Sequence, residues 1–449
     1  MLFESTRHGS DPGAAPVGFA QALLKGLAPD GGLFVPQQWP LHAPQELCER
    51  IGLPPAQYLT AAGLARIAAL LLAPLVAGSE LAGQLPAISA QAFSFPAPLV
   101  PLDADGRLGV LELFHGPTAA FKDFGARFLA ACMSRLRAPG QRPLNILVAT
   151  SGDTGGAVAA AFHHLPGVSV SVLFPKGLVS PTQEHQLTCW DDNVRSFAVR
   201  GTFDDCQRMV KAAFMDPELN RRFDLSSANS INLGRLLPQA VYYAAASLQC
   251  WSGHGEPVFF VVPSGNLGNA VAGLWAKRLG MPIGEFILAH NANRTVPDLL
   301  QTGKFEPRPS IATLASAMDV GNPSNLERLR ALYPDLAQLR ATISADAVTD
   351  EQIRARIRSG FNDYGQIWCP HTATAAEVHA RLSPARRQAG RWLLAATAHP
   401  AKFREIVEPL IGRKVAVPES LGRLLELPSR AVEIAADVDA LRQGLAQYS

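Results

Sequence analysis

The chain has 449 residues, of which 48% are hydrophobic and 17% charged, and its net charge is +2 with histidine neutral. A chain of this length and composition buries a large core and divides into about two or three domains. Lys and Arg are scattered among Asp and Glu rather than gathered in blocks, so neither nucleic acid nor a membrane is expected as a partner.

The first segment, residues 1–96, is expected to form a mainly helical N-terminal unit. Its most apolar stretch, residues 61–77, contains Arg66 and Pro74 and does not predict a membrane span. The N-terminus lacks the charged-then-apolar order of a signal peptide, so we expect a cytoplasmic protein. Proline-rich punctuation after Phe93 marks the boundary to residues 97–449.

The six cysteines lie far apart, without a C-x-x-C pair or a nearby His-x-x-His partner. They are Cys48, Cys132, Cys189, Cys206, Cys250 and Cys369. This spacing favours buried thiols over a disulfide or zinc framework, and no metal is expected.

Beyond residue 97, short β-rich runs alternate with helical stretches rich in Ala and Leu. The runs cover residues 144–149, 168–174, 194–199, 257–262, 285–289 and 391–396. This alternation predicts an α/β protein with parallel sheets covered by helices. Ligands gather at the carboxyl ends of such strands, so we expect the functional residues in the loops that follow the runs.

Lys122 follows a strand-like run, residues 108–114, and a turn, and it stands in the sequence His-Gly-Pro-Thr-Ala-Ala-Phe-Lys-Asp-Phe of residues 115–124. Phe124 and Phe128 continue at helical spacing, which places Lys122 in the first turn of a helix. Burial and the positive end of a helix both disfavour an ammonium ion, and a neutral amine attacks an aldehyde to form a Schiff base. The alternative is a snorkelling surface lysine.

A first strand-end loop, residues 151–156, has the sequence Ser-Gly-Asp-Thr-Gly-Gly and leads into a helix. Its glycines allow backbone N–H groups to approach an anion, and the helix start adds a favourable dipole. The hydroxyls of Ser151 and Thr154 supply further donors for a carboxylate. The alternative is a tight turn with a helix cap.

A second strand-end loop, residues 263–269, has the sequence Pro-Ser-Gly-Asn-Leu-Gly-Asn and is expected to form a cup of amides around a phosphate. Asn266 and Asn269 add side-chain bonds. The loop is not the G-x-G-x-x-G of dinucleotide folds, and the next strand ends at His290 and Asn291 without the acidic residue of those folds. No G-x-x-x-x-G-K-[ST] occurs, which argues against a nucleoside triphosphate.

A third strand-end loop begins at residue 396 and contains Thr397, whose neutral hydroxyl suits a ring nitrogen. His399 is interpreted as a helix-start or packing histidine rather than a base. Lys402 is expected to be solvated. A phosphate cup, a carboxylate loop, a hydroxyl for a ring nitrogen and one masked lysine together indicate pyridoxal phosphate acting on an amino acid.

The ordered motifs resemble those of the threonine synthase family, whose pyridoxal-phosphate enzymes convert O-phosphohomoserine and water to threonine and phosphate. The resemblance covers almost the whole chain. Its motifs lie at residues 4–7, 26–36, 111–124, 149–155, 227–232, 317–325, 370–373 and 397–403.

The resemblance implies fold type II, similar to the β subunit of tryptophan synthase, with two open α/β domains beside the N-terminal unit. The smaller α/β subdomain is expected at about residues 120–235, and the larger one takes the remainder of residues 97–449. Carried over by position, Lys122 is the Schiff-base lysine and Thr397 faces the pyridine nitrogen. The remaining positions form two sets: Gly265, Asn266, Leu267, Gly268 and Asn269 for the cofactor phosphate, and Ser151, Gly152, Asp153 and Thr154 for the substrate carboxylate.

The sequence departs from the family pattern at three positions. The family often has Phe where this chain has Leu267, Asp where it has Asn269, and Leu where it has Ala119. A cup of amides tolerates the first two changes, so only a charge-specific role of that aspartate is put in doubt. Ala119 leaves slightly more room before the lysine.

The reaction implied by the resemblance is a carbon–oxygen lyase reaction, in which β,γ-elimination of phosphate is followed by addition of water at Cβ. Lys122 is expected to act as general base and acid in most proton transfers. The substrate phosphate needs a second anion site, for which arginine suits the phosphate oxygens. The candidates are Arg7, Arg235, His115 and Asn232, with Lys176 as a weaker option; for each arginine the alternative is a surface ion pair.

Two other functions remain open from the sequence. A phospho-lyase shares the cofactor motifs but releases 2-oxobutyrate, and a catalytically silent binding protein keeps the fold without the reaction. The intact Lys122 and glycine loops argue against the silent protein. The chain is expected to be a monomer or a homodimer.

Overall fold

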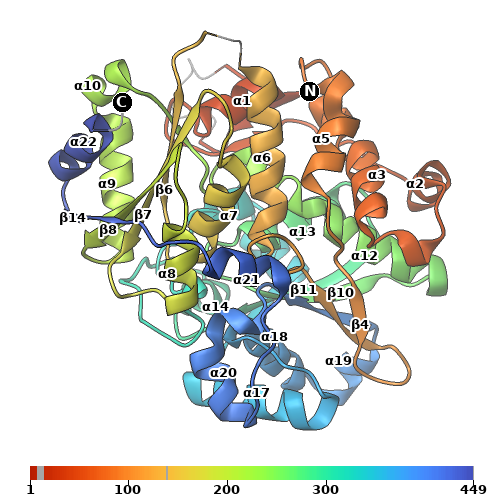
Figure 1. Cartoon of the computed structure of the whole chain (residues 1–449). Coiled ribbons are helices and arrows are strands. Elements are labelled where there is room, and N and C mark those ends of the chain that lie inside the picture. The colour runs from red at the N-terminus through yellow and green to blue at the C-terminus, as the bar shows by residue number, and fades with distance from the viewer. Residues whose placement is uncertain (8–14, 138–139, 448–449) are drawn as a thin grey trace.

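The computed structural model describes residues 1–7, 15–137 and 140–447. Two sheets of parallel strands, each covered by helices, make up most of the molecule, and the N-terminal helices pack together at one side (Figure 1). The α/β class and the alternation of strands and helices are confirmed. No helix in the described part of the chain is long and apolar enough to cross a membrane.

The N-terminal unit is mainly helical but also contains a three-stranded antiparallel sheet in the order β2-β1-β3, which was not predicted. Its strands have four residues or fewer, too short for a recognisable alternation. The elements are β1 (Leu2–Ser5), β2 (Val17–Gly18), α1 (Phe19–Lys25), β3 (Phe34–Pro36), α2 (Pro44–Ile51), η1 (Pro55–Gln57), α3 (Ala61–Leu71), α4 (Ala73–Val76), η2 (Ala82–Gln84) and α5 (Leu85–Ala92).

The larger sheet has six strands in the order β12-β11-β10-β13-β5-β4, all parallel except the edge strand β4. These are β4 (Leu99–Pro101), β5 (Leu108–Glu112), β10 (Val258–Pro263), β11 (Ile283–His290), β12 (Ile343–Ala347) and β13 (Arg391–Ala396). Alternate residues of β10 enter two separate cores: Phe260 and Val262 face α12 and α13, whereas Val261 packs with α18. Burial on both faces explains why the strand is continuously apolar.

The helices that follow these strands are α12 (Gln239–His254), α13 (Gly268–Arg278), α14 (Thr295–Thr302), η3 (Ser316–Met318), α15 (Leu326–Leu332), α16 (Leu336–Thr342), α17 (Asp350–Tyr364), α18 (Pro370–Ala380), α19 (Pro384–Gln388), η4 (Pro400–Phe403), α20 (Arg404–Ile411) and α21 (Glu419–Leu425). A capping box at Thr349 and Gln352 begins α17, and the left-handed Gly365 ends it.

The smaller sheet has five parallel strands in the order β14-β8-β7-β6-β9. These are β6 (Leu144–Ala149), β7 (Val168–Pro175), β8 (Val194–Arg200), β9 (Asp224–Ser227) and β14 (Val432–Ala435). Ile146 and Val148 share a core with α7, whereas Leu147 and Ala149 share one with α9. The associated helices are α6 (Lys122–Leu136), α7 (Asp153–Phe162), α8 (Pro181–Thr188), α9 (Phe203–Met215), α10 (Pro217–Arg222), α11 (Leu233–Leu236) and α22 (Val438–Ala446).

The six predicted β-rich runs are all strands, with bounds within two residues of those expected. The C-terminal strand β14 runs parallel to β8 at the edge of the smaller sheet, and α22 lies beside α9 (Figure 1). The smaller sheet therefore includes residues 432–435, beyond the range of about 120–235 that the sequence suggested.

Candidate active site

A pocket lies where the loops after β5, β6, β10 and β13 meet, at the carboxyl ends of strands from both parallel sheets. The loops come from distant parts of the sequence, as expected for strand-end loops. The predicted residues that line the pocket are Lys122, Ser151, Asp153, Thr154, Arg235, Gly265, Asn266, Leu267, Gly268, Asn269 and Thr397.

Lys122 is the first residue of α6, as predicted, and its Nζ lies 4.9 Å from the ring centroid of Phe121. The loop before it is held by the loop after β13: Phe121 N donates to Thr397 O at 2.9 Å, and His399 N donates to Ala119 O at 3.0 Å. Ala119 has a left-handed backbone, with φ of 55°. These contacts place the Lys122 amine beside the Thr397 loop.

The pKa of Lys122 is lowered to about 8. Desolvation is the main cause, the nearby Arg235 cation adds to it, and the Asp153 carboxylate opposes it. At neutral pH a fraction of the amine is therefore uncharged and nucleophilic, as the sequence suggested.

The loop of residues 263–269 forms a cup at the start of α13. Leu267 takes a left-handed conformation, with φ of 62°, and directly precedes the helix, whose first amides point out of its end. A Cβ at Gly265 would lie 2.9 Å from Met318 Cα, so the close approach there requires glycine. The cup contains no ionisable side chain.

Asn269 holds its side chain in one orientation inside the cup. Its Oδ1 accepts hydrogen bonds from Tyr242 Oη at 2.5 Å and Tyr243 Oη at 3.0 Å. Burial raises the pKa of both phenols, so both remain donors. The buried Nδ2 of Asn269 has no partner among the described residues, and it is a donor available to an anion.

The loop of residues 150–156 departs in part from the prediction. Thr150 Oγ1 accepts hydrogen bonds from Gly152 N at 3.0 Å and Gly155 N at 2.9 Å, so these two amides are used within the loop. Gly152 itself does not line the pocket; a Cβ there would lie 2.5 Å from Gln183 Nε2. The groups left for an anion are the amides at the start of α7 and the hydroxyls of Ser151 and Thr154.

Lys402 is fully buried, and the expectation that it is solvated is wrong. Its Nζ lies 2.6 Å from Asp153 Oδ1 and donates to Thr118 O at 2.9 Å. Gln183 Nε2 also donates to Asp153 Oδ1, at 2.9 Å. Burial opposes ionisation of Asp153, but the charge and the hydrogen bond of Lys402, with smaller contributions from neighbouring groups, together hold the pKa of that carboxyl below its usual value.

Arg235 is a buried cation on the pocket wall, in α11. Its guanidinium donates to Ala228 O, and its buried Nε has no partner among the described residues. Desolvation lowers the pKa of Arg235 to about 10, with the charge of Asp123 opposing the shift, and the side chain stays protonated at neutral pH. A charged donor thus remains available on the wall beside Lys122.

Three of the four main candidates for the substrate phosphate do not line the pocket in this structure. Arg7 Nε pairs with Glu327 Oε1 at 2.9 Å on the surface, which corresponds to the surface ion pair given above as the alternative to a phosphate ligand. His115 Nε2 lies 2.7 Å from Glu112 Oε2 outside the pocket. Asn232 is buried as the cap of α11 and donates through Nδ2 to Leu23 O at 2.9 Å.

Several pocket residues were missed by sequence reasoning, although the motifs that contain all of them except Gln239 had been noticed. They are Asn229, Ser230, Gln239, Ala317, Met318 and His371. The segments 227–232, 317–325 and 370–373 had supported the resemblance without being assigned a role. His371 Nε2 accepts a hydrogen bond from Ala317 N at 3.2 Å, and burial lowers the pKa of His371 to about 4, so it is neutral and its acceptor nitrogen is occupied.

His399 caps a helix start, as predicted. Its Nδ1 accepts a hydrogen bond from Ala401 N at 3.1 Å, and its ring packs edge-on against Phe114. Desolvation lowers the pKa of His399 to about 4. It is not among the residues that line the pocket.

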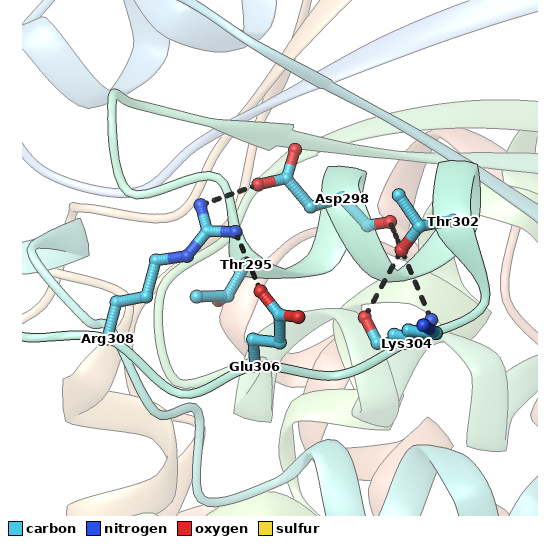
Figure 2. Close-up of a pocket in the computed structure, with 6 residues that line it drawn as sticks. All are labelled: Thr295, Asp298, Thr302, Lys304, Glu306 and Arg308. Carbon is cyan, nitrogen blue, oxygen red and sulfur yellow. Dashed lines mark hydrogen bonds and ion pairs between the residues drawn. The ribbon is translucent and has the colours of Figure 1, made fainter.

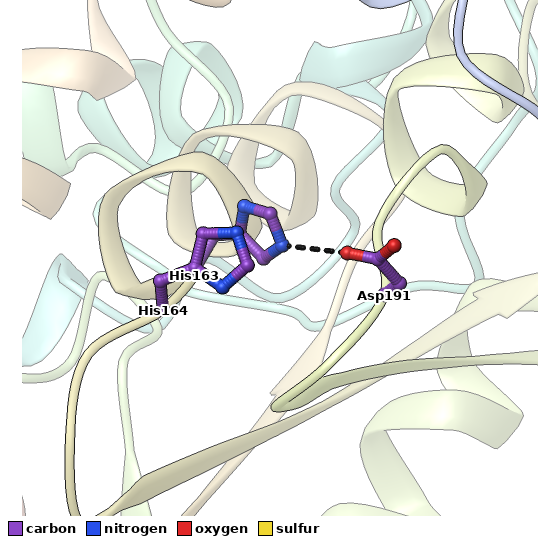
Figure 3. Close-up of side chains that lie close together, drawn as sticks. All are labelled: His163, His164 and Asp191. Atoms are coloured by element: carbon purple, nitrogen blue, oxygen red, sulfur yellow. Dashed lines mark hydrogen bonds and ion pairs between the residues drawn. The ribbon is translucent and has the colours of Figure 1, made fainter.

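Two other hollows or clusters are made mostly of exposed or half-buried groups that already pair with each other. In the hollow beside α14, Arg308 Nη1 lies 2.7 Å from Asp298 Oδ2 (Figure 2). In the described part of the chain, one group has metal-ligating atoms close together: His163, His164 and Asp191 (Figure 3). There Asp191 is already paired with His163 and with Arg430, whose cation disfavours a metal.

Comparison with known proteins decides the family. A family model described as "Pyridoxal-phosphate dependent enzyme" matches residues 92–396, and models for the threonine synthase N terminus and C-terminal region match residues 2–57 and 372–444. The threonine synthase of Haemophilus influenzae is 40% identical over 431 residues, covering 95% of this chain and 96% of the relative. The chain belongs to the threonine synthase family.

Solved structures of threonine synthases agree with this assignment. The crystal structure of threonine synthase from Escherichia coli has a TM-score of 0.89 and 38% identity, with 100% of both chains covered. The PLP-bound threonine synthase from Brucella melitensis has a TM-score of 0.86 and 33% identity, covering 100% of this chain and 99% of that one. The chain is a pyridoxal-phosphate-dependent lyase of fold type II.

The pocket has suitable donors for the cofactor. The amides at the start of α13 and the unpartnered Asn269 Nδ2 suit a phosphate, and neither needs a charged side chain. Lys122 and Thr397 both line the pocket, and their loops are joined by the hydrogen bond from Phe121 N to Thr397 O. The residues present therefore fit pyridoxal phosphate.

Proposed function

We propose that the protein converts O-phospho-L-homoserine and water to L-threonine and phosphate. The observation that carries this proposal is the gathering of Lys122, the 263–269 cup, the start of α7 and Arg235 around one pocket. Such a pocket offers one lysine for covalent attachment and separate groups for three anions: two phosphates and one carboxylate.

Lys122 would hold pyridoxal phosphate through a covalent bond to its aldehyde, the cup of residues 265–269 would bind the cofactor phosphate, and the Thr397 hydroxyl would serve the ring nitrogen. Pyridoxal phosphate supplies an electron sink for a carbanion at the substrate Cα. A neutral hydroxyl at Thr397 would bond the ring nitrogen without forcing its protonation.

Lys122 is the group that moves protons. Its lowered pKa of about 8 leaves both forms of the amine accessible near neutral pH, which suits a residue that takes protons at Cα and Cβ and returns them at Cγ and Cα. His371 is a poor alternative base because its Nε2 already accepts the Ala317 amide.

Arg235 binds the substrate phosphate, since it is the one member of the four predicted phosphate ligands that lines the pocket. Its unpartnered Nε is a charged donor, and a guanidinium matches phosphate oxygens. Ser151 and Thr154, with the start of α7, bind the substrate carboxylate, and Asp153 orders that loop through Gln183 and Lys402.

A product assay tests the proposal. Purified protein loaded with pyridoxal phosphate and given O-phosphohomoserine should release threonine and phosphate in equal amounts, and the Lys122→Ala variant should release neither. Release of 2-oxobutyrate and ammonia with almost no threonine would instead establish a phospho-lyase. Binding without any product would establish the silent homologue.

Compartment and assembly form part of the same proposal. The cysteines in the structure are all free thiols, which matches a reducing compartment, so we place the reaction in the cytoplasm. The active unit is a monomer or a homodimer, in which residues 1–96 form the N-terminal unit and residues 97–449 the catalytic core. Light scattering on the purified holoenzyme measures its mass directly.

A further inference from the structure

The loop that binds the substrate carboxylate contains a carboxylate of its own. Asp153 lines the pocket in the first turn of α7, beside Ser151 and Thr154. Two carboxylates a few ångströms apart in a partly desolvated site repel each other strongly. A site for an anion therefore needs a compensating cation close to Asp153.

Lys402 supplies that cation from outside the pocket. Its side chain is fully buried, it does not line the pocket, and its Nζ lies 2.6 Å from Asp153 Oδ1. Gln183 donates to the same oxygen at 2.9 Å, which fixes the orientation of the carboxylate. The pair therefore brings one positive and one negative charge to the carboxylate loop.

Lys402 also joins the carboxylate loop to the Lys122 loop. Its Nζ donates to Thr118 O at 2.9 Å. Thr118 in turn donates through N and Oγ1 to the carboxylate of Asp123, at 2.9 and 2.6 Å, and Asp123 follows Lys122 in α6. One ammonium thus contacts the segments before Lys122 and at the start of α7.

The geometry points to Lys402 as a positioning residue that neutralises Asp153, so that the loop of residues 151–154 accepts the carboxylate of the amino-acid substrate. This inference rests on the proposed function, because it takes the ligand of that loop to be an amino-acid carboxylate. Lys402 acts through Asp153 and touches neither substrate nor cofactor.

The test compares two ligands that differ in the carboxylate. L-threonine and L-threoninamide are titrated into the holoenzyme and binding is followed by calorimetry. Lys402→Met should weaken the binding of L-threonine by at least about tenfold, because an unpaired Asp153 repels the carboxylate of the ligand. The affinity for L-threoninamide, which has no carboxylate, should change by less than about threefold, which corresponds to a binding free energy within about 0.7 kcal/mol of wild type.

A charge-matched double variant separates electrostatics from loss of packing. Asp153→Asn with Lys402→Met removes both charges, and it should restore L-threonine binding to within about threefold of wild type. Lys414→Met is the control, because Lys414 pairs with Glu408 at 2.8 Å on the surface, and it should leave both ligands unchanged.

Asp153→Asn alone carries the test if Lys402→Met does not fold. It leaves the Lys402 cation without its carboxylate, so the preference for L-threonine over L-threoninamide should increase. Equal weakening of both ligands by Lys402→Met, no recovery in the double variant, or an unchanged preference in Asp153→Asn contradicts the inference. Failure of wild type to bind L-threonine or to form it contradicts the proposed function itself.

Discussion

The cup of residues 263–269 on the larger sheet and the loop of residues 150–156 on the smaller sheet offer their hydrogen-bond donors in different ways. Residues 263–269 use amides, a helix start and the neutral Asn269, whose orientation is set by two buried phenols. In the loop of residues 150–156, two backbone amides donate to Thr150 Oγ1, and Asp153 pairs with the buried Lys402. The ability of the neutral cup to accept an anion depends on its backbone shape, whereas that of the charged loop depends on the balance between the charges of Asp153 and Lys402.

This difference predicts that single substitutions of the buried charged residues cost more stability or activity than single substitutions in the neutral cup of residues 263–269. Removing one partner of a buried ion pair leaves an uncompensated charge, which costs more free energy than the loss of one neutral hydrogen bond. The following predictions test that ranking, beginning with the largest expected effect.

Lys402→Met should lower the free energy of unfolding by about 3–5 kcal/mol at neutral pH, because Asp153 is left buried and unpaired. In wild type the depressed pKa of Asp153 contributes stability above its unfolded value of 3.8, and this is lost as the pH falls through the folded pKa. In the variant the pH dependence of this contribution reverses, because protonation of Asp153 removes the unpaired charge. The difference in the free energy of unfolding between variant and wild type should therefore shrink as the pH is lowered. Urea unfolding of the apoenzyme measures both effects, and a deficit independent of pH argues against the ion-pair explanation.

Arg235→Gln should reduce kcat/KM for O-phosphohomoserine by about 100-fold, because a buried charged hydrogen bond to phosphate is worth about 2–3 kcal/mol. Steady-state kinetics of the holoenzyme measure the ratio. Arg7→Gln is the matched control and should stay within about threefold of wild type, as expected for a surface ion pair. A larger loss of kcat/KM in Arg7→Gln than in Arg235→Gln would instead indicate that Arg7 binds the substrate phosphate.

Asn269→Ala should weaken pyridoxal phosphate binding by about tenfold, through loss of the Nδ2 donor and of the acceptor for Tyr242 and Tyr243. Because the cup keeps its backbone amides, turnover at saturating cofactor should change little. Fluorescence titration of the apoenzyme with pyridoxal phosphate gives the affinity. A loss as large as that expected for Arg235→Gln would mean that the neutral cup also depends on one side chain.

The rate at which the apoenzyme combines with pyridoxal phosphate should rise with pH through a midpoint near 8, since the neutral Lys122 amine is the nucleophile. Arg235 lowers the pKa of Lys122, so Arg235→Gln should move this midpoint upward, whereas Asp153→Asn should move it downward. Stopped-flow absorbance across the pH range measures the midpoints. Identical midpoints in all three proteins would show that these charges do not reach Lys122.

The strands and their functional loops followed from local pattern. The runs at residues 144–149 and 391–396 are β6 and β13 with the predicted bounds, because a parallel strand buried on both faces is apolar over most of its length. The Lys122 helix start was likewise predictable from its turn and the aromatic spacing that follows. The pocket residues in these loops converge because parallel strands end on one side of a sheet.

What the sequence did not reveal depends on contacts between distant segments. Lys402 lies in the short helix η4 after a strand-end loop, where a lysine is expected to be solvated, and only the approach of Asp153 and Thr118 makes its burial possible. The close packing of Gly152 against Gln183, 31 positions later in the chain, likewise has no local sign in the sequence. The return of β14 to the smaller sheet joins residues more than 200 positions apart, which local periodicity does not encode.

Reduction of the holoenzyme with borohydride, followed by peptide mapping, tests the central claim that Lys122 holds the cofactor. The pyridoxyl label should lie on the peptide containing Lys122, be absent in Lys122→Ala, and stay on Lys122 in Lys414→Met, which removes a lysine with an exposed side chain. Labelling of another lysine in wild type, or equal labelling of Lys122→Ala, would contradict the account.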